Sequence, residues 1–169
     1  PNSSSQAAIH ADKMRDAMDA GAAVNYLLEK GIRPSDILCK EAFENAITMV
    51  IALGGSTNAV LHLLAMANAA NVPLTIDDFT RLGEKTPVLA DLKPSGAHMM
   101  ANLVHIGGTV PLMRILIKEG LLNGDCLTVT GKTLKQNVSR SELKYPAGQD
   151  IIRSLDEPIK KTSHLVIMR

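Results

Sequence analysis

Two apolar stretches on either side of a glycine pair, within residues 40–70, constrain the fold of this chain most strongly. The first, residues 40–53, has a helical pattern, and the second, residues 59–70, is almost wholly apolar. Gly54 and Gly55 break the pattern between them, and the Ser-Thr pair that follows supplies a natural N-cap for a new helix. Because a helix that is apolar on all sides has to be covered, we expect residues 59–70 to form a buried helix.

Helical periodicity and capping signals predict further helices. A long helix with an apolar stripe is expected from about Ile9 to Lys30. Thr75 followed three residues later by Asp78 resembles a capping box and predicts the start of a short helix. Two more helices are expected at about 97–106 and 110–119, because a glycine pair separates two apolar runs there.

The chain changes character after Gly124. Residues 126–130 have high β propensity, and a short helix is expected to start within 131–134. Residues 139–163 are polar and resemble a connecting segment, whereas 164–168 have the pattern of a β-strand. The sequence therefore predicts a predominantly helical α/β fold with a few short strands.

Composition excludes several classes of function. The chain has 169 residues, of which 46% are hydrophobic and 21% charged, so one domain with a sizeable core is possible. A net charge of +1 and an aromatic content of 2% give no basis for nucleic acid binding. No apolar run reaches the roughly 18 residues of a membrane span. Two isolated cysteines indicate a reducing compartment rather than a disulfide framework.

The segment GGSTNAVLH, residues 54–62, is the strongest candidate site. A helix that starts after the glycines would leave backbone N–H groups free at its positive end, where a carboxylate, phosphate or cluster could bind. Asn58 and His62 are one turn apart and would share a face. Alternatively, a serine or threonine simply caps the helix, and Asn58 and His62 bond to each other or to nearby backbone. The candidate residues are Gly54, Gly55, Ser56, Thr57, Asn58 and His62.

A second candidate is the loop DLKPSG, residues 91–96. It places Lys93 and Ser95 on a loop shaped by proline and glycine, although an ordinary turn would have the same composition. The Gly-Lys-Thr at 131–133 lacks the earlier glycine of a phosphate-binding loop, so we reject nucleotide binding. No compact metal-ligand pattern is present, and the reactive residues do not form a complete catalytic set.

Five blocks of sequence resemble, in order, the dihydroxy-acid dehydratase family, which also includes 6-phosphogluconate and sugar-acid dehydratases. The blocks are EAFENAITMVIALGGSTNAVLHLLAMANAANVPLTIDDF (41–79), LADLKPSG (89–96), GGTVPLMRILIKEGLL (107–122), GDCLTVTGKTL (124–134) and GQDIIRSLDEPIKKTSHLVIMR (148–169). They cover nearly the whole chain, and DLKPSG with GDCLTVTGKTL favours the dihydroxy-acid branch.

The resemblance implies a fold and an activity. It implies that residues 1–138 are the later half of an N-terminal α/β/α domain and that 139–169 lead into a C-terminal β-barrel domain. It implies the dehydration of 2,3-dihydroxy acids, such as 2,3-dihydroxyisovalerate, to 2-keto acids in branched-chain amino-acid biosynthesis. Family members are homodimers that use an iron–sulfur cluster, [2Fe–2S] or [4Fe–4S], and Mg²⁺. Bacterial members are cytoplasmic, and eukaryotic ones are mitochondrial or plastidic.

The family motifs that carry the chemistry are missing from this sequence. The cluster cysteines and the Mg²⁺ ligands would precede Pro1, and the serine base would follow Arg169. We therefore expect an internal fragment that has no catalytic residue and no metal ligand of its own, binds no cofactor and is inactive alone. The eight candidate residues would then line or support the pocket of the whole enzyme. Two alternatives are a sugar-acid dehydratase of the same family and a non-catalytic helical binding module.

Overall fold

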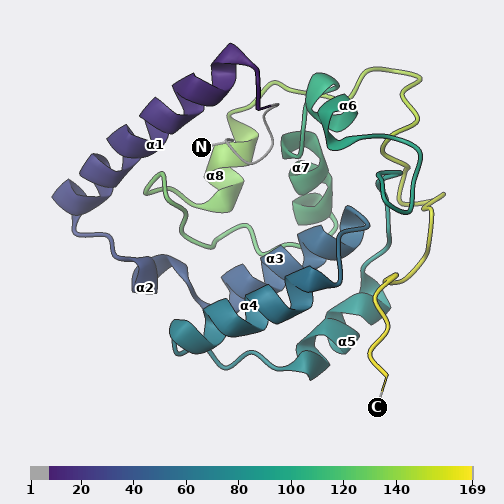
Figure 1. Cartoon of the computed structure of the whole chain (residues 1–169), viewed down its shortest axis with the longest axis horizontal. Helices are drawn as coiled ribbons and strands as arrows, with labels where there is room; N and C mark the ends of the chain where they lie inside the picture. The colour runs from purple at the N-terminus through teal and green to yellow at the C-terminus, as the bar shows by residue number, and fades with distance from the viewer. Residues whose placement is uncertain (1–7, 169) are drawn as a thin grey trace.

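The computed structural model describes residues 8–168, which fold into a set of helices joined by loops (Figure 1). Most of the expected helices are confirmed, although the one expected at 97–106 is restricted to 100–105 because residues 97–99 belong to the preceding loop. No helix in this described part is both long enough and apolar enough to cross a membrane. The helices are α1 (Ala11–Lys30), α2 (Pro34–Ile37), α3 (Lys40–Ala52), α4 (Asn58–Ala69), α5 (Ile76–Lys85), α6 (Met100–His105), α7 (Val110–Lys118) and α8 (Leu134–Ser139).

The expected predominantly helical fold is confirmed for residues 8–168, and the few short strands expected there are reduced to four isolated β bridges. Residues 126–130 form a tight turn instead, in which Thr128 donates its N–H to the carbonyl of Lys132 at 2.9 Å. Residues 164–168 have no strand partner in the described part of the chain. Their β propensity therefore produces no sheet, because a strand needs a neighbour with which to exchange backbone hydrogen bonds.

Helices α3, α4 and α5 pack together and enclose one hydrophobic core (Figure 1). Ile47 and Ile51 of α3 are completely buried at its centre, and Phe79 of α5 is 3% exposed. The core consists of Phe43, Ile47, Ile51, Val60, Leu63, Ala67, Phe79 and Leu82.

A second core lies between α6, α7 and two non-helical segments. Leu103, Leu112 and Leu116 are completely buried there, and residues 89–92 and 151–152 pack against them. The segment 139–163 is therefore more than a polar connection, because it contributes Ile151 and Ile152 to the core.

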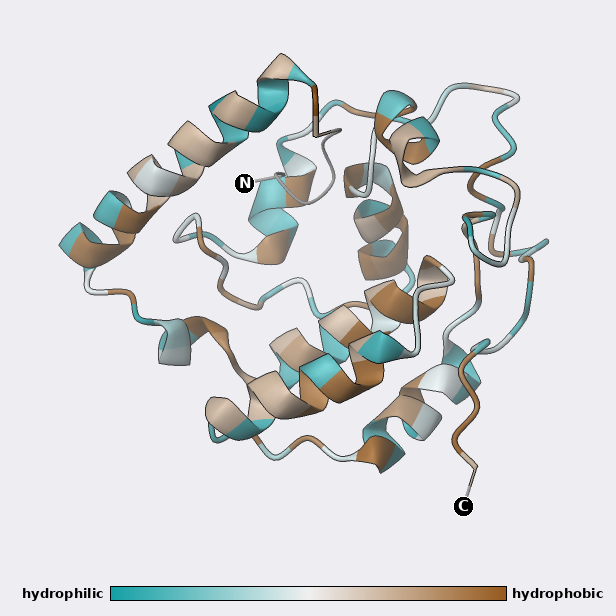
Figure 2. Cartoon of the chain, viewed as in Figure 1, coloured by the Kyte–Doolittle hydropathy of each residue, from teal (hydrophilic) through white to brown (hydrophobic). Residues whose placement is uncertain are grey.

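The expectation that the apolar helix 59–70 is buried is wrong in this chain. Only Val60, Leu63 and Ala67 of α4 are buried, whereas Leu61 is 69% and Met66 51% exposed. Figure 2 shows that apolar residues nevertheless extend around most of α4. Residues 8–168 contain nothing that covers the second face of this helix, and its sequence alone could not show this.

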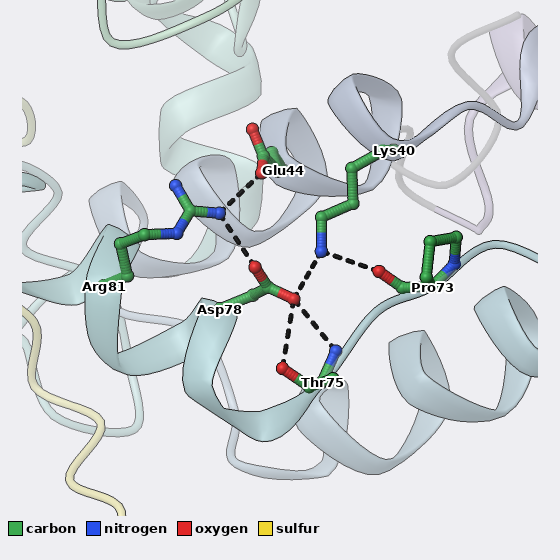
Figure 3. Close-up of polar contacts among 6 residues, drawn as sticks. All are labelled: Lys40, Glu44, Pro73, Thr75, Asp78 and Arg81. Carbon is green, nitrogen blue, oxygen red and sulfur yellow. Dashed lines mark hydrogen bonds and ion pairs between the residues drawn. The ribbon is translucent and has the colours of Figure 1, made fainter.

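An ion-pair network centred on Asp78 fastens α5 to α3 (Figure 3). Asp78 accepts hydrogen bonds from Lys40, from Arg81 at 2.8 Å and from the backbone N–H of Thr75 at 2.9 Å. Arg81 also pairs with Glu44 of α3. Thr75 and Asp78 form the expected capping box, so one carboxylate both begins α5 and ties it to α3.

The network keeps Asp78 ionised. Burial alone would raise the pKa of Asp78, but hydrogen bonds from Arg81, Lys40 and Thr75 outweigh burial and hold the pKa well below its usual range. A carboxylate with a lowered pKa stabilises the folded state at pH values above its unfolded pKa of about 3.9. That contribution is lost as the pH falls through the lower, folded pKa.

Asp78→Asn is expected to lower the free energy of unfolding at pH 7 by about 3 kcal/mol, because two cations lose their buried partner. The difference from the unmodified chain should shrink as the pH falls below about 4, where the Asp78 carboxyl becomes protonated in the unfolded chain while it stays ionised in the fold. Urea titrations at pH 7 and pH 3 measure both effects. Glu84→Gln, on an exposed position of the same helix, is the control and should change neither value. An equal effect of the two substitutions would contradict the role of Asp78.

Candidate functional site

The loop of residues 54–57 turns the chain between α3 and α4. Gly54 has a φ of +65°, which favours glycine, and its N–H donates to the carbonyl of Ile51 at 3.0 Å. Gly55 donates to the carbonyl of Val50 at 2.8 Å, and a Cβ on Gly55 would lie only 3.0 Å from that oxygen. Both glycines are therefore required by the turn that ends α3.

Two residues just before the first turn of α4 leave their backbone donors unused. Thr57 is the N-cap, but its side chain makes no capping bond, and Ser56 Oγ instead accepts from the N–H of Asn58 at 3.2 Å. Within residues 8–168, the N–H groups of Ser56 and Thr57 find no acceptor. The positive end of α4 therefore offers donors that suit a carboxylate or another anion.

Asn58 and His62 lie one turn apart on α4, and both are exposed. Their side chains have no hydrogen-bond partner among the described residues, and they do not bond to each other. Among the described residues, the structure thus gives no support to the alternative in which the two side chains bond to each other or to nearby backbone. Both are available to a ligand or to another part of a larger protein.

The loop 91–96 lies directly against the loop 54–57. Leu89 and Ala90 donate their N–H groups to the carbonyl of Ala52 at 2.9 and 3.0 Å, which holds this segment at the end of α3. Ser95 Oγ lies 3.7 Å from the position that a Cβ on Gly54 would occupy. Two candidate segments that are about 40 residues apart in the sequence are therefore adjacent in the fold.

The loop 91–96 is held in one shape by tight packing around Gly96. Its N–H donates to the carbonyl of Leu92 at 2.8 Å, and the peptide bond between Lys93 and Pro94 is cis. A Cβ on Gly96 would lie 2.4 Å from the carbonyl carbon of Asp91, closer than any real contact. Lys93 and Ser95 are exposed on the loop.

Sequence reasoning missed His164, which joins the end of the chain to this site. His164 Nε2 donates to the carbonyl of Gly55 at 2.6 Å, and its Nδ1 is buried without a hydrogen-bond partner among the described residues. No motif marks this histidine, since it stands alone before an apolar run that was expected to be a strand. The contact brings the segment 165–167 beside α4.

An open hollow of 280 Å³ lies between α4 and this final segment. Thr57 and Asn58 contribute the polar part of its lining, and the other lining side chains are apolar. The lining residues are Thr57, Asn58, Val60, Leu61, Leu165, Val166 and Ile167. Part of the candidate site is therefore hollowed, with a polar rim formed by the start of α4.

A larger hollow, of 430 Å³, lies at the start of α7 and contains none of the candidate residues. His105 and Lys144 line it beside the glycine pair 107–108. The hydroxyl of Tyr145 donates to the carbonyl of Gly108 at 2.8 Å, and burial raises the pKa of this tyrosine. These contacts stabilise the turn before α7.

The two cysteines, which are 87 positions apart, interact in the fold. Cys126 accepts a hydrogen bond from Asn45 at 3.5 Å. Burial raises the pKa of Cys126 to about 11, with further contributions from the Cys39 thiol and the nearby Glu41 and Asp125 carboxylates. A thiol of that pKa is protonated at neutral pH and is a poor nucleophile.

The cofactors that the family resemblance implies do not fit the residues described. Residues 8–168 contain no group of three or more His, Cys, Asp or Glu side chains that could hold a metal ion. An iron–sulfur cluster requires several thiolates, whereas this part of the chain has one buried thiol and one half-buried thiol. This part of the chain therefore supplies no ligand set for a cluster or for Mg²⁺.

Comparison with known proteins identifies relatives along the whole chain. Residues 1–137 match the family model described as dihydroxy-acid/6-phosphogluconate dehydratase N-terminal. A dihydroxy-acid dehydratase of Methylococcus capsulatus is 64% identical over 169 residues, and one of Vesicomyosocius okutanii is 63% identical over the same length. A dihydroxy-acid dehydratase of Lactococcus lactis is 56% identical over 99% of the chain. The chain spans 30% of the length of each of these relatives.

Gly96→Ala is expected to lower the free energy of unfolding by at least about 2 kcal/mol, because the added methyl group would displace the backbone of Asp91. The control is Gly21→Ala in α1, where an added Cβ meets nothing within 4 Å. Alanine favours a helix over glycine by up to about 1 kcal/mol, so the control should be neutral or stabilising. Thermal and urea unfolding of both variants measure the difference. Wild-type stability of the Gly96 variant would contradict the tight loop.

Proposed function

The chain belongs to the dihydroxy-acid/6-phosphogluconate dehydratase family, and we propose that it forms part of a hydro-lyase that dehydrates 2,3-dihydroxy acids to 2-keto acids. The substrate proposed is of the 2,3-dihydroxyisovalerate type, used in branched-chain amino-acid biosynthesis. The relatives of 63–64% identity, which are named dihydroxy-acid dehydratase, match the chain along its whole length and support this branch of the family.

The observation that carries the proposal is the meeting of the loops 54–57 and 91–96. Gly54 and Ser95 belong to two separate blocks that resemble the family and are 41 positions apart in the sequence, yet they are adjacent in the fold. Polar residues from separated blocks that come together on an exposed surface are typical of a functional site on loops held by a rigid scaffold. The exposed residues Ser56 and Thr57, whose N–H groups have no acceptor within residues 8–168, lie in the first of these loops, where a ligand could reach them.

The residues of this chain would bind and orient the substrate. The N–H groups of Ser56 and Thr57 suit its carboxylate, because they lie at the positive end of α4. Asn58 and His62 present polar side chains on the adjacent turn, where they would hydrogen-bond a hydroxyl of the substrate or hold a neighbouring group. Ser95 and Lys93, on the loop 91–96, would contact the substrate from the side opposite the start of α4.

The cofactors and the catalytic base of the proposed enzyme would lie outside residues 8–168. We propose that an iron–sulfur cluster, Mg²⁺ and the catalytic base are supplied by other segments of a polypeptide of the relatives' length. The low number of thiols and the absence of a ligand cluster among the described residues support this division. We also propose a homodimer, and a cytoplasmic location is favoured because the relatives reported are bacterial.

The activity can be tested in a graft, defined as the Methylococcus capsulatus dihydroxy-acid dehydratase in which this chain replaces the matched stretch. The graft is expected to form keto acid from 2,3-dihydroxyisovalerate, whereas the 169-residue chain alone should form none and show no iron–sulfur absorbance. Asn58→Ala and His62→Ala in the graft should each lower kcat about 10- to 100-fold, because both exposed side chains are proposed to bind the substrate or to hold a group that does. Keto-acid formation is followed for each variant.

Asn68→Ala is the matched control, because Asn68 is an exposed polar residue at the far end of the same helix. It should leave kcat unchanged. Wild-type rates for both the Asn58 and His62 variants would contradict the assignment of the pocket. Faster dehydration of an aldonate than of the dihydroxy acid would identify a sugar-acid dehydratase instead. Keto acid formed by the isolated chain would contradict the division of the active site.

A further inference from the structure

Within residues 8–168, His164 makes one polar contact through its side chain, and that contact is with the backbone of the candidate site. Its Nε2 lies 2.6 Å from the carbonyl oxygen of Gly55, and its Nδ1 is buried without a hydrogen-bond partner among the described residues. Since a carbonyl oxygen can only accept, the ring carries its proton on Nε2. The tautomer with the proton on Nδ1 is disfavoured, because it would bury a donor that has no acceptor.

The imidazole ring of His164 is held in place by the residues on both sides of it. Ser163 donates its N–H to the carbonyl of Gly83 in α5 at 2.8 Å, and a Cβ on Gly83 would come within 2.8 Å of the Ser163 Cβ. Leu165 packs against the core of α3, α4 and α5, and its N–H donates to Ser163 Oγ at 2.9 Å. The end of the chain therefore runs beside α5 (Figure 1), and packing there sets the position of the ring.

The carbonyl of Gly55 and the N–H of Ser56 belong to the same planar peptide unit. In a trans peptide these two groups point in opposite directions, so a bond that fixes the carbonyl also fixes the direction of the N–H. Within residues 8–168, His164 is the only donor to the Gly55 carbonyl, and the Ser56 N–H has no acceptor. The hydrogen bond also polarises the peptide unit, which makes its N–H a stronger donor.

This peptide unit needs such a hold, because glycine makes it easy to turn over. The rotation changes ψ of Gly55 and φ of Ser56, and glycine has no Cβ to oppose the change on its side. The N–H of Gly55 donates to the carbonyl of Val50 at 2.8 Å, but that bond does not fix ψ of Gly55. Without His164, the Ser56 N–H would be free to turn away from a ligand at the start of α4.

We propose that His164 is a positioning residue of the candidate site, and that it aims the N–H of Ser56 at the carboxylate of the substrate. It does not touch the substrate and acts through the peptide unit between Gly55 and Ser56. The substrate in this proposal rests on the proposed function, whereas the geometry rests on the hydrogen bond of His164. The alternative is that the contact only fastens the end of the chain, and the two roles predict different results below.

The hold on the peptide unit can be measured without enzyme activity. The sequence contains a single Gly-Ser step, at 55–56, so ¹³C-carbonyl labelling of glycine and ¹⁵N labelling of serine give one NMR correlation for this peptide. His164→Gln keeps a donor close to the place of Nε2, whereas His164→Asn carries the same amide on a side chain one carbon shorter. In the 169-residue chain, the Gln variant should keep the correlation near its original position, and the Asn variant should shift it in both dimensions.

In the graft, the same two substitutions separate positioning from fastening. His164→Asn is expected to raise KM for 2,3-dihydroxyisovalerate about tenfold and to leave kcat within about twofold, because a hydrogen bond to a charged group is lost. His164→Gln should return KM to within about twofold of the unmodified graft. A loss of stability alone would lower the active fraction, and hence the apparent kcat, without changing KM. His105→Asn, at an exposed histidine outside the site, is the control and should change neither constant.

Two results would overturn the proposal. An unshifted correlation in the Asn variant would mean that His164 does not hold the peptide unit. Equal KM values for the Asn and Gln variants in an active graft would mean that the contact only fastens the end of the chain.

Two further outcomes remain decisive. If the Asn variant fails to fold, the ¹⁵N shifts of the His164 ring in the unmodified chain decide, because a proton on Nε2 supports the proposal and a proton on Nδ1 overturns it. A graft that forms no keto acid would count against the proposed function, whereas the NMR correlation would still show whether His164 holds the peptide unit.

Discussion

The carbonyl oxygen of Ala52 joins the two halves of this structure. It lies at the C-terminal end of α3, where a helix leaves its last carbonyl groups without partners. Leu89 and Ala90 both donate to it, at 2.9 and 3.0 Å, so a segment from far along the chain completes the helix end. Ala52 is completely buried, and an unsatisfied carbonyl in that position would cost about 1–3 kcal/mol.

The two hydrogen bonds to Ala52 determine where the rest of the site lies. Because residues 89–90 are fixed at the end of α3, the loop 91–96 lies against the turn that starts α4. The same segment recruits later parts of the chain, since Leu89 accepts from Arg153 at 2.8 Å and Asp91 donates to Ile151 at 2.8 Å. The α3–α5 core and the α6–α7 core are thus connected at the point where the candidate residues gather.

Local signals in the sequence predicted the parts of the fold that depend on neighbouring residues. The capping box of Thr75 and Asp78 and the glycines 54 and 55 were recognisable, because their hydrogen bonds close within a few residues. The contact between Ser95 and Gly54 and the hydrogen bond of His164 were not, because they join segments far apart in the chain.

The wrong expectations have a common physical reason. Residues 164–168 have β propensity but no partner strand within the described part of the chain, and α4 has apolar residues on a face that nothing there covers. Propensity and periodicity report what a segment can do when a partner is present, and they do not reveal whether the partner is there. The division of the chain at residue 138 stays a prediction.

Residue-resolved hydrogen–deuterium exchange of the Leu89 and Ala90 amides tests the central joint most directly. If both amides donate to Ala52, they should exchange as slowly as the amides of Ile47 and Ile51 in the buried part of α3. The N–H groups of Ser56 and Thr57, which have no acceptor within residues 8–168, should exchange quickly in the same experiment. Exchange of Leu89 and Ala90 at the rate of Ser56 and Thr57 would show that the loops do not meet, and would contradict this account of the site.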